Sequence, residues 1–393
     1  MNSGSATGFR ALSGILLAAL LPLSAASKGT VTIGNITCMT GSESYIAPGE
    51  VPGLEDEAAK INAAGGINGW MLKIISYDCA SVATDCLPLA KRLIDQDHVV
   101  AIIGPPYSGG CISIANTADT SHVPLITNTA TNLNVTVDQS GKVHPYMFRA
   151  CFIDPYQGTA LADYCYNKLG KRRAALITDV ASPYTVGLHQ FFQERFEKLG
   201  GKVVMNEGYN KGDQEFRAQL AKVKSSKADV LLCCADNYKD PGLVAKQAKA
   251  LNLNIQMIGG DAWMVKDILP FAGKEMDGAF FTALASTDDP AFAKYNAEYK
   301  QKHPGKEPNA WGYMSMDAMR IIENAIRVVT ADGSALSQEK LRDAIENTKD
   351  LPVFTAKKFT FDKTNHNPYN RPALLIQIKD GQFKILGSYT PKG

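Results

Sequence analysis

Short apolar runs rich in β-branched residues alternate with amphipathic stretches along most of the chain, beginning near residue 30. This alternation is typical of a parallel sheet whose strands are joined by helices that cover both faces. Helices are predicted, for example, over 51–63, 87–95, 187–199 and 216–225. The predicted strands are 31–36, 72–77, 99–103, 124–127, 174–178, 202–206, 230–233 and 256–258.

The last part of the chain follows a different plan. Two helices are predicted over 314–330 and 337–347. Short strands, rather than strand–helix units, are predicted after them at 358–361, 373–378 and 384–386, and the turn Lys379-Asp380-Gly381 separates the last two.

Two of the predicted strands, one in each half of the chain, end in a glycine-containing turn that leads into a helix. Gly104 follows the strand 99–103, and Gly259 and Gly260 follow the strand 256–258. Open parallel sheets bind ligands just outside the carboxyl ends of their strands. Two such sheets that face each other would form a cleft between these turns, and we expect the functional site there.

The first 27 residues have the layout of a cleavable secretory signal peptide. Arg10 precedes an apolar run of about 13 residues, 11–23, and the small residues Ser24 to Ser27 follow it. A membrane anchor is the alternative, but the run is shorter than the ~20 residues that span a bilayer. We expect cleavage near Ala26. Because no Cys lies at that junction to hold a lipid, we expect a freely soluble mature protein in the periplasm.

Composition narrows the possible classes of protein. About 365 residues remain after the signal peptide, so two domains are expected. Lys and Arg number 41 against 39 Asp and Glu, a balance that argues against nucleic acid or an anionic membrane as partner. The cysteines and histidines match no zinc spacing, and no cofactor or metal is implied. A disulfide among Cys79, Cys86 and Cys111 is one expectation, with buried free thiols the alternative for the other cysteines.

A set of short segments follows in a fixed order along the chain. They are Thr32-Ile-Gly34, Met39-Thr-Gly41, Ile61-Asn-Ala-Ala-Gly-Gly-Ile-Asn-Gly69, Tyr77-Asp78, Ile103-Gly104, Val123-Pro124-Leu-Ile, Ala130-Thr131-Asn132, Phe148-Arg149, Asp154 and Gln157-Gly158. Their order and spacing resemble the branched-chain amino acid (leucine/isoleucine/valine) binding protein family of bacterial ABC importers, which are type I periplasmic binding proteins. The resemblance covers essentially the whole mature chain, and its most specific matches lie in the N-terminal third.

The resemblance implies one wall of a ligand site in the first lobe. Ser108 starts the helix after the third strand, and Thr129, Ala130 and Thr131 lie in the loop after the fourth. Hydroxyls and N–H groups at a helix N-terminus suit an anion, so this wall is expected to hold a ligand carboxylate. Ser108 taken alone would be an ordinary N-cap, and the convergence of three hydroxyls on two adjacent strand ends is what favours the ligand site.

The opposite lobe would supply Tyr184, Asp236 and Asp261. Asp261 matches the acidic residue that holds the α-ammonium group of the ligand in the family. Asp236 falls where the family often has a Tyr, and it could instead cap the next helix. A zwitterion enclosed in a cleft needs a partner at each end, because an unpaired buried charge is very costly.

Three aromatic residues, Tyr45, Tyr107 and Trp263, are expected beside the site, where rings could meet the ligand side chain. Each could equally be an ordinary core or surface residue. The loop between Met39 and Gly53 departs from the family pattern by about two extra residues, which leaves the alignment of Tyr45 open.

The sequence supports three other functions less well than binding and delivery. A hydrolase lacks support because Tyr107-Ser108-Gly109-Gly110 is not a G-x-S-x-G elbow, and no Walker A sequence is present. A ligand-sensing receptor domain would need a membrane helix, yet no apolar stretch of 18 residues follows residue 30. A binder of aromatic carboxylic acids or amides would keep the hydroxyls but have little use for Asp261.

We therefore predict two Rossmann-like α/β lobes joined by a hinge of three crossing segments. Lobe I is expected to comprise residues 28–150 plus 285–370, and lobe II residues 151–284 plus 371–393. The predicted function is that of a monomeric, non-enzymatic solute-binding protein. It would bind a small amino acid between the lobes and deliver it to the membrane permease subunits of an ABC importer.

Overall fold

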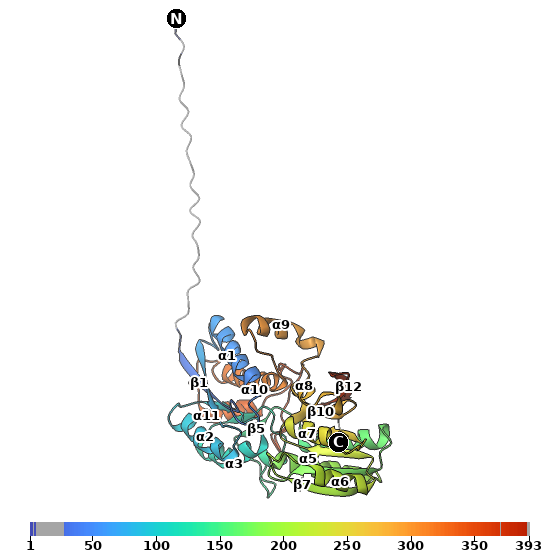
Figure 1. Ribbon diagram of the computed structural model, residues 1–393. Coiled ribbons are helices and arrows are strands. Elements are labelled where there is room, and N and C mark those ends of the chain that lie inside the picture. The colour runs from blue at the N-terminus through green and yellow to red at the C-terminus, as the bar shows by residue number, and fades with distance from the viewer. Residues whose placement is uncertain (3, 5–26, 370, 391–393) are drawn as a thin grey trace.

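The computed structural model describes residues 1–2, 4, 27–369 and 371–390. Apart from Met1, Asn2, Gly4 and Ser27, the predicted signal peptide lies outside the described residues. The remainder folds into two α/β lobes that lie side by side, each built on its own sheet (Figure 1).

The sheet of lobe I has five strands in the order β2-β1-β3-β4-β5, and all of its neighbours are parallel. Side chains on its central strands alternate between two cores: Ile103 packs on the side of α1 and α10, and Ile102 on the side of α2 and α3. Both faces are therefore buried, as the continuous apolar runs predicted. The strands are β1 Gly29–Thr37, β2 Trp70–Asp78, β3 Ala101–Ile103, β4 Leu125–Thr127 and β5 Met147–Arg149.

The sheet of lobe II has seven strands in the order β12-β11-β10-β9-β8-β6-β7. Strands β6 to β10 pair in parallel, whereas β11 and β12 add an antiparallel edge. The strands are β6 Arg173–Asp179, β7 Lys202–Tyr209, β8 Val230–Cys234, β9 Gln256–Gly259, β10 Phe280–Ala283, β11 Ala373–Lys379 and β12 Gln382–Tyr389.

Helices cover both faces of each sheet. In lobe I they are α1 Ala47–Ala63, α2 Cys86–Asp95, α3 Ser108–Ser121, α9 Ala293–Lys302, α10 Ala310–Val329 and α11 Gln338–Glu346. In lobe II they are α4 Asp154–Asp163, α5 Pro183–Lys198, α6 Arg217–Ser226, α7 Lys239–Ala250 and the short α8 Ile268–Ala272. The chain passes between the lobes three times: after β5, after β10 and before β11.

Most predicted elements have a counterpart, and the exceptions are short. Strands β5 and β10 were not predicted, because they are only three and four residues long, too short to show a periodic pattern of apolar and polar residues. The strand predicted at 358–361 is wrong: this segment forms only isolated bridges, Leu351 with Phe359 and Phe361 with Pro368. The turn after β11 is as predicted, since Asp380 and Gly381 both have positive φ, the conformation of a tight hairpin.

All eight cysteines are free and buried in this structure. The disulfide expected among Cys79, Cys86 and Cys111 is therefore not formed in it.

Candidate functional site

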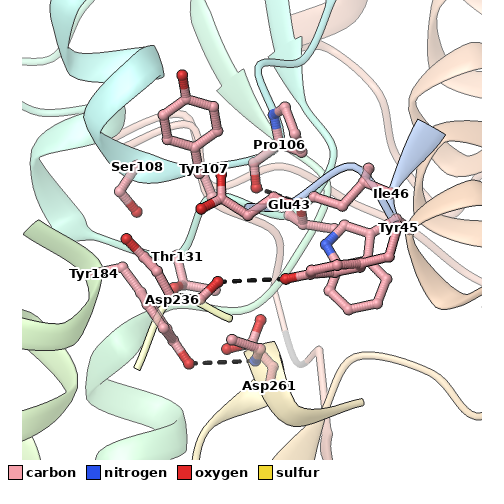
Figure 2. A pocket seen from close by; sticks show the side chains of 14 residues that line it. Glu43, Tyr45, Ile46, Pro106, Tyr107, Ser108, Thr131, Tyr184, Asp236 and Asp261 are labelled. Atoms are coloured by element: carbon pink, nitrogen blue, oxygen red, sulfur yellow. Dashed lines mark hydrogen bonds between the residues drawn. The ribbon is translucent and has the colours of Figure 1, made fainter. Parts of the chain in front are cut away.

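A cavity lies where the carboxyl ends of the two sheets face each other (Figure 2). Its volume is about 40 Å³, which is room for about three water molecules. Lobe I lines it with Glu43, Tyr45, Ile46, Pro106, Tyr107, Ser108, Thr129, Ala130, Thr131 and Trp311, and lobe II with Tyr184, Asp236, Asp261 and Ala262. Nine of the ten residues predicted from the sequence thus meet at one place; Trp263 does not.

Ser108 occupies the first position of α3, and its side chain does not cap that helix. Its hydroxyl oxygen instead accepts a hydrogen bond from the backbone N–H of Asn132, at 3.2 Å. The hydroxyl proton is therefore left to donate elsewhere, next to the positive end of a helix of 14 residues. This arrangement suits an anionic group in the cavity.

The two threonines of the β4 loop differ in what their hydroxyls do. Thr129 donates to the carbonyl oxygen of Pro106 at 2.5 Å, so its proton is already used inside lobe I. Thr131 accepts from the amide of Gln157 at 3.4 Å. Of the two, Thr131 is the better placed to donate to a ligand.

Asp261 has a buried carboxyl oxygen in the cavity that lacks a hydrogen-bond partner among the described residues. This oxygen is its Oδ1, and the residue as a whole is 5% exposed. Burial raises the pKa of its carboxyl to about 6, against the effect of hydrogen bonds from Tyr184 and Gln157. An ionised carboxylate in this position would be stabilised by a cation in the cavity.

Gly260 allows the second lobe to present Asp261 in this way. A Cβ at Gly260 would lie 2.2 Å from the Tyr184 hydroxyl and 3.0 Å from Oε1 of Gln157. Gln157 links the two walls, because its Oε1 accepts from the backbone N–H of Asp261 at 3.3 Å while its Nε2 reaches Thr131. No motif or spacing in the sequence points to this role of Gln157.

Asp236 does not cap the following helix. Asn237 does so: its Oδ1 accepts from the N–H groups of Lys239 at 2.8 Å and Asp240 at 3.0 Å. The carboxyl of Asp236 is thereby free to face the cavity. Burial and the nearby Glu43 raise the pKa of Asp236 to about 7, while Lys211 opposes this shift.

Glu43, which the sequence analysis missed, comes from the long β1–α1 loop. It is 3% exposed and forms an ion pair with Lys211 of lobe II, so this pair joins the lobes beside the cavity. Burial raises the pKa of Glu43, and Lys211 opposes the rise. The only sequence signal was the departure of this loop from the family pattern.

Aromatic rings close one side of the cavity. Tyr45 packs edge-on against Trp311 at 5.3 Å and Tyr238 at 5.4 Å between centroids, and its hydroxyl donates to the carbonyl of Asp236 at 3.3 Å. Trp311 was missed because it stands in the first turn of α10, far along the chain. The ring of Tyr107 turns away from Asp236 and Asp261, and its hydroxyl lies 3.2 Å from the sulfur of Cys86 (Figure 2).

Trp263 is a correction to the predicted site. Its side chain is fully buried in the core of lobe II, beside Phe281, and covers Gly259. Asp261 and Trp263 share a 3₁₀ turn with three residues per turn, so side chains two positions apart point in different directions. Because Asp261 faces the cavity, the side chain of Trp263 points into the core.

Within the part of the chain that the structure describes, no helix is long and apolar enough to cross a membrane. In the same residues, no group of three or more His, Cys, Asp or Glu side chains is placed to hold a metal ion.

Comparison with known proteins places this geometry in a family. A family model described as periplasmic binding protein matches residues 30–382. The chain is 30% identical to an amino acid binding protein of Pseudomonas aeruginosa over 260 residues. These aligned residues make up 66% of this chain and 68% of that protein. The structure of a leucine-binding protein from Thermotoga maritima superposes with a TM-score of 0.81 at 29% identity, covering 92% of this chain and 99% of that one. The structure of the branched-chain amino acid transporter substrate-binding protein LivJ of Streptococcus pneumoniae, in complex with isoleucine, superposes with a TM-score of 0.82 at 26% identity. The superposition covers 92% of this chain and 100% of that one.

Two lobes with a polar cavity between their strand ends define a solute-binding protein. The chain belongs to the periplasmic binding protein family, in the branched-chain amino acid group with the type I fold, so the fold and family predicted from the sequence are confirmed. Membership of this family implies a protein that works outside the cytoplasm.

Proposed function

We propose that the chain binds a free amino acid in the cavity between its lobes and delivers it to the permease subunits of an ABC importer. Asp261 holds the α-ammonium group, and Ser108 and Thr131 hold the α-carboxylate. The observation that supports this most is the buried Oδ1 of Asp261, for which the described residues supply no hydrogen-bond partner. A carboxylate in that state is matched by a ligand that brings its own cation.

The other wall fits the other end of a zwitterion. Ser108 keeps its hydroxyl proton, because its oxygen accepts from Asn132 rather than capping α3. It stands at the N-terminus of that helix, where the aligned peptide dipoles favour negative charge. Lobe I therefore offers neutral donors to an anion, opposite a buried carboxylate on lobe II.

A ligand without a cation fits this cavity less well. An aromatic carboxylic acid or an amide would leave Asp261 unpaired in a closed site, a cost that protonation near pH 6 would only partly relieve. We therefore place an amino acid ahead of both alternatives.

The proposal treats residues 28–150 with 285–370 and residues 151–284 with 371–393 as two rigid halves that close on the ligand. Contacts across the cavity support a closed arrangement: Glu43 pairs with Lys211, and the side-chain amide of Asn132 donates to the carbonyl of Pro183 at 2.7 Å. The closed halves together present the surface that a permease would recognise. We propose that the protein acts as a monomer, without catalysis.

The test is to recover the protein from its host and identify what it holds. The mature chain should begin near Ser27 or Lys28 in the soluble fraction outside the cytoplasm. Mass spectrometry should then find one small amino acid per chain, chemically unchanged after long incubation. Recovery of the Met1 form from membranes would contradict export, and turnover abolished by Ser108→Ala would contradict a purely binding role.

A further inference from the structure

Three thiols gather behind the cavity, at the ends of the first two strands. Cys38 follows β1, Cys79 follows β2, and Cys86 begins α2; all three side chains are fully buried. The sulfur atoms of Cys38 and Cys79 lie 3.4 Å apart. The sulfur of Cys86 lies 3.2 Å from the hydroxyl of Tyr107.

The sheet itself sets Cys38 and Cys79 next to each other. In the parallel pair β1 and β2, Thr37 lies opposite Asp78, and the N–H of Cys79 donates to the carbonyl of Thr37 at 2.9 Å. The two cysteines thus occupy the next position on neighbouring strands. Strands lie about 4.8 Å apart, within the roughly 4.4–6.8 Å that disulfides require between Cα atoms.

We propose that Cys38 and Cys79 form a disulfide bond in the exported protein, and that this bond fixes the loop of residues 38–46 that lines the cavity. The proposal rests on the export proposed above, because a thiol pair remains reduced in most cytoplasms. A bond of about 2.05 Å requires the two sulfurs to approach by a little over 1 Å, which rotation of the side chains can supply.

The oxidant is the disulfide of a thiol–disulfide oxidoreductase, and the exchange takes place before folding buries the sulfurs. The Cys79 thiolate attacks one sulfur of that disulfide, forming a mixed disulfide and releasing the other sulfur as a thiolate. Cys38 then loses its proton and attacks the Cys79 sulfur, displacing the second thiolate. Two thiols have lost two protons and two electrons, and the oxidant leaves as a dithiol.

The bond would act on the ligand site through the loop that starts at Cys38. This loop supplies Glu43, Tyr45 and Ile46 to the cavity, and Cys38 itself contacts Oε2 of Glu43 at 3.8 Å. Tying its first residue to the end of β2 removes conformations in which these side chains leave the cavity. The bond closes a ring of about 40 residues, which stabilises the fold by limiting the unfolded chain.

The decisive experiment uses the mature chain refolded in a glutathione buffer poised toward oxidation, then denatured and alkylated. Six of the eight cysteines should react, since two are paired, and peptide mapping should find Cys38 linked to Cys79. Eight reacting thiols, or a link between Cys79 and Cys86, would overturn the proposal. Because refolding needs no export, this result stands whether or not the protein is secreted; thiol counting on protein from the native host tests export separately.

Matched variants and two physical readouts test the consequence for the loop. Cys86→Ala should retain the linked peptide, and Cys38→Ala should lose it. On reduction, the melting temperature of the wild type should fall by roughly 5–10 °C, and hydrogen exchange in the peptide covering residues 39–46 should become faster. Cys38→Ala should show neither change. Equal melting and exchange in oxidised and reduced wild type would show that the bond does not fix the loop.

Discussion

The two walls of the cavity hold their polar groups in opposite states. On lobe I, the hydroxyls of Ser108 and Thr129 and the carbonyl of Pro106 are neutral and hydrogen-bonded within the lobe, and the carboxyl that lobe I adds to the lining, Glu43, is already paired with Lys211. On lobe II, Asp261 and Asp236 are carboxyls whose pKa values burial raises to about 6 and 7. One wall is largely satisfied before a ligand arrives, and the other is not.

This difference indicates which wall selects for charge. A neutral wall positions a ligand but loses little when the ligand lacks an ion, because its donors can turn to water or backbone. A buried carboxylate discriminates strongly, since the absence of a cation leaves it unpaired. We therefore expect substitutions on lobe II to change which ligands bind, and substitutions on lobe I to change mainly how tightly they bind.

The largest effect is expected from Asp261→Ala. Removing one member of a buried ion pair costs about 3–5 kcal/mol, so affinity for the copurified amino acid should fall more than a hundredfold in calorimetry. Asp267→Ala is the matched control, because Asp267 is an exposed acid in the same segment and should bind as the wild type does. A loss of similar size in both variants would show that the segment, rather than the carboxylate, is responsible.

A smaller effect should separate the two threonines of lobe I. Thr131→Val removes a donor to the ligand carboxylate and should cost about 1.5–3 kcal/mol of binding free energy. Thr129→Val removes a hydroxyl that serves Pro106, so it should lower stability by about 1 kcal/mol while affinity changes little. Titration calorimetry and thermal melting on both proteins check this, and the reverse order of affinities would contradict the assignment.

Lowering the pH should weaken binding by about tenfold between pH 7.5 and pH 5. The raised pKa of Asp261, about 6, means that most of its carboxyl is protonated at pH 5 and cannot pair with an ammonium group. Stability of the ligand-free protein should move the other way. A folded-state pKa above the unfolded value means that the native state binds more protons, so its stability rises as the pH falls through this window.

Affinity and melting temperature measured across pH 5 to 7.5 would therefore show opposite trends. Asp261→Asn should flatten the affinity profile, because the amide does not titrate. An unchanged slope in Asp261→Asn would assign the pH dependence to another group.

The smallest effect on binding is expected from Trp263→Phe. The ring lies in the core of lobe II and its Nε1 has no hydrogen-bond partner among the described residues, so Phe leaves no new polar group unsatisfied. We expect a loss of about 1–3 kcal/mol in unfolding free energy with affinity unchanged within about twofold. A tenfold loss of affinity at an unchanged melting temperature would return Trp263 to the site.

The features of this molecule that depend on short sequence segments could be predicted from the sequence. Alternating apolar runs predicted the buried sheets, and the turn through Gly260 pointed to Asp261 at a strand end. The sequence alone could not show whether Asp236 contacts the ligand or caps the next helix. The structure excludes the cap, because Asn237 caps α7. Such a choice between neighbouring residues is made by three-dimensional geometry.

Residues that enter the site from distant elements left little trace in the sequence. Trp311 reaches the cavity from the start of α10, where the side-chain amide of the neighbouring Asn309 donates to the carbonyls of Tyr45 and Ile46 at 2.9 and 3.1 Å. Glu43 is placed by an ion pair with Lys211, 168 residues away. No periodicity or spacing encodes such partners, and the direction of Trp263 depended on the 3₁₀ turn that Asp261 begins.

The central claim is that Asp261 holds an ammonium group, and one comparison tests it most directly. Calorimetry on the wild type and on Asp261→Asn should be run with the copurified amino acid and with its des-amino analogue. The wild type should strongly prefer the amino form, and Asp261→Asn should lose most of that preference while keeping its fold. If Asp261→Asn binds the native ligand as tightly as the wild type, no ammonium group pairs with Asp261, and a carboxylic acid or amide without a cation is the ligand.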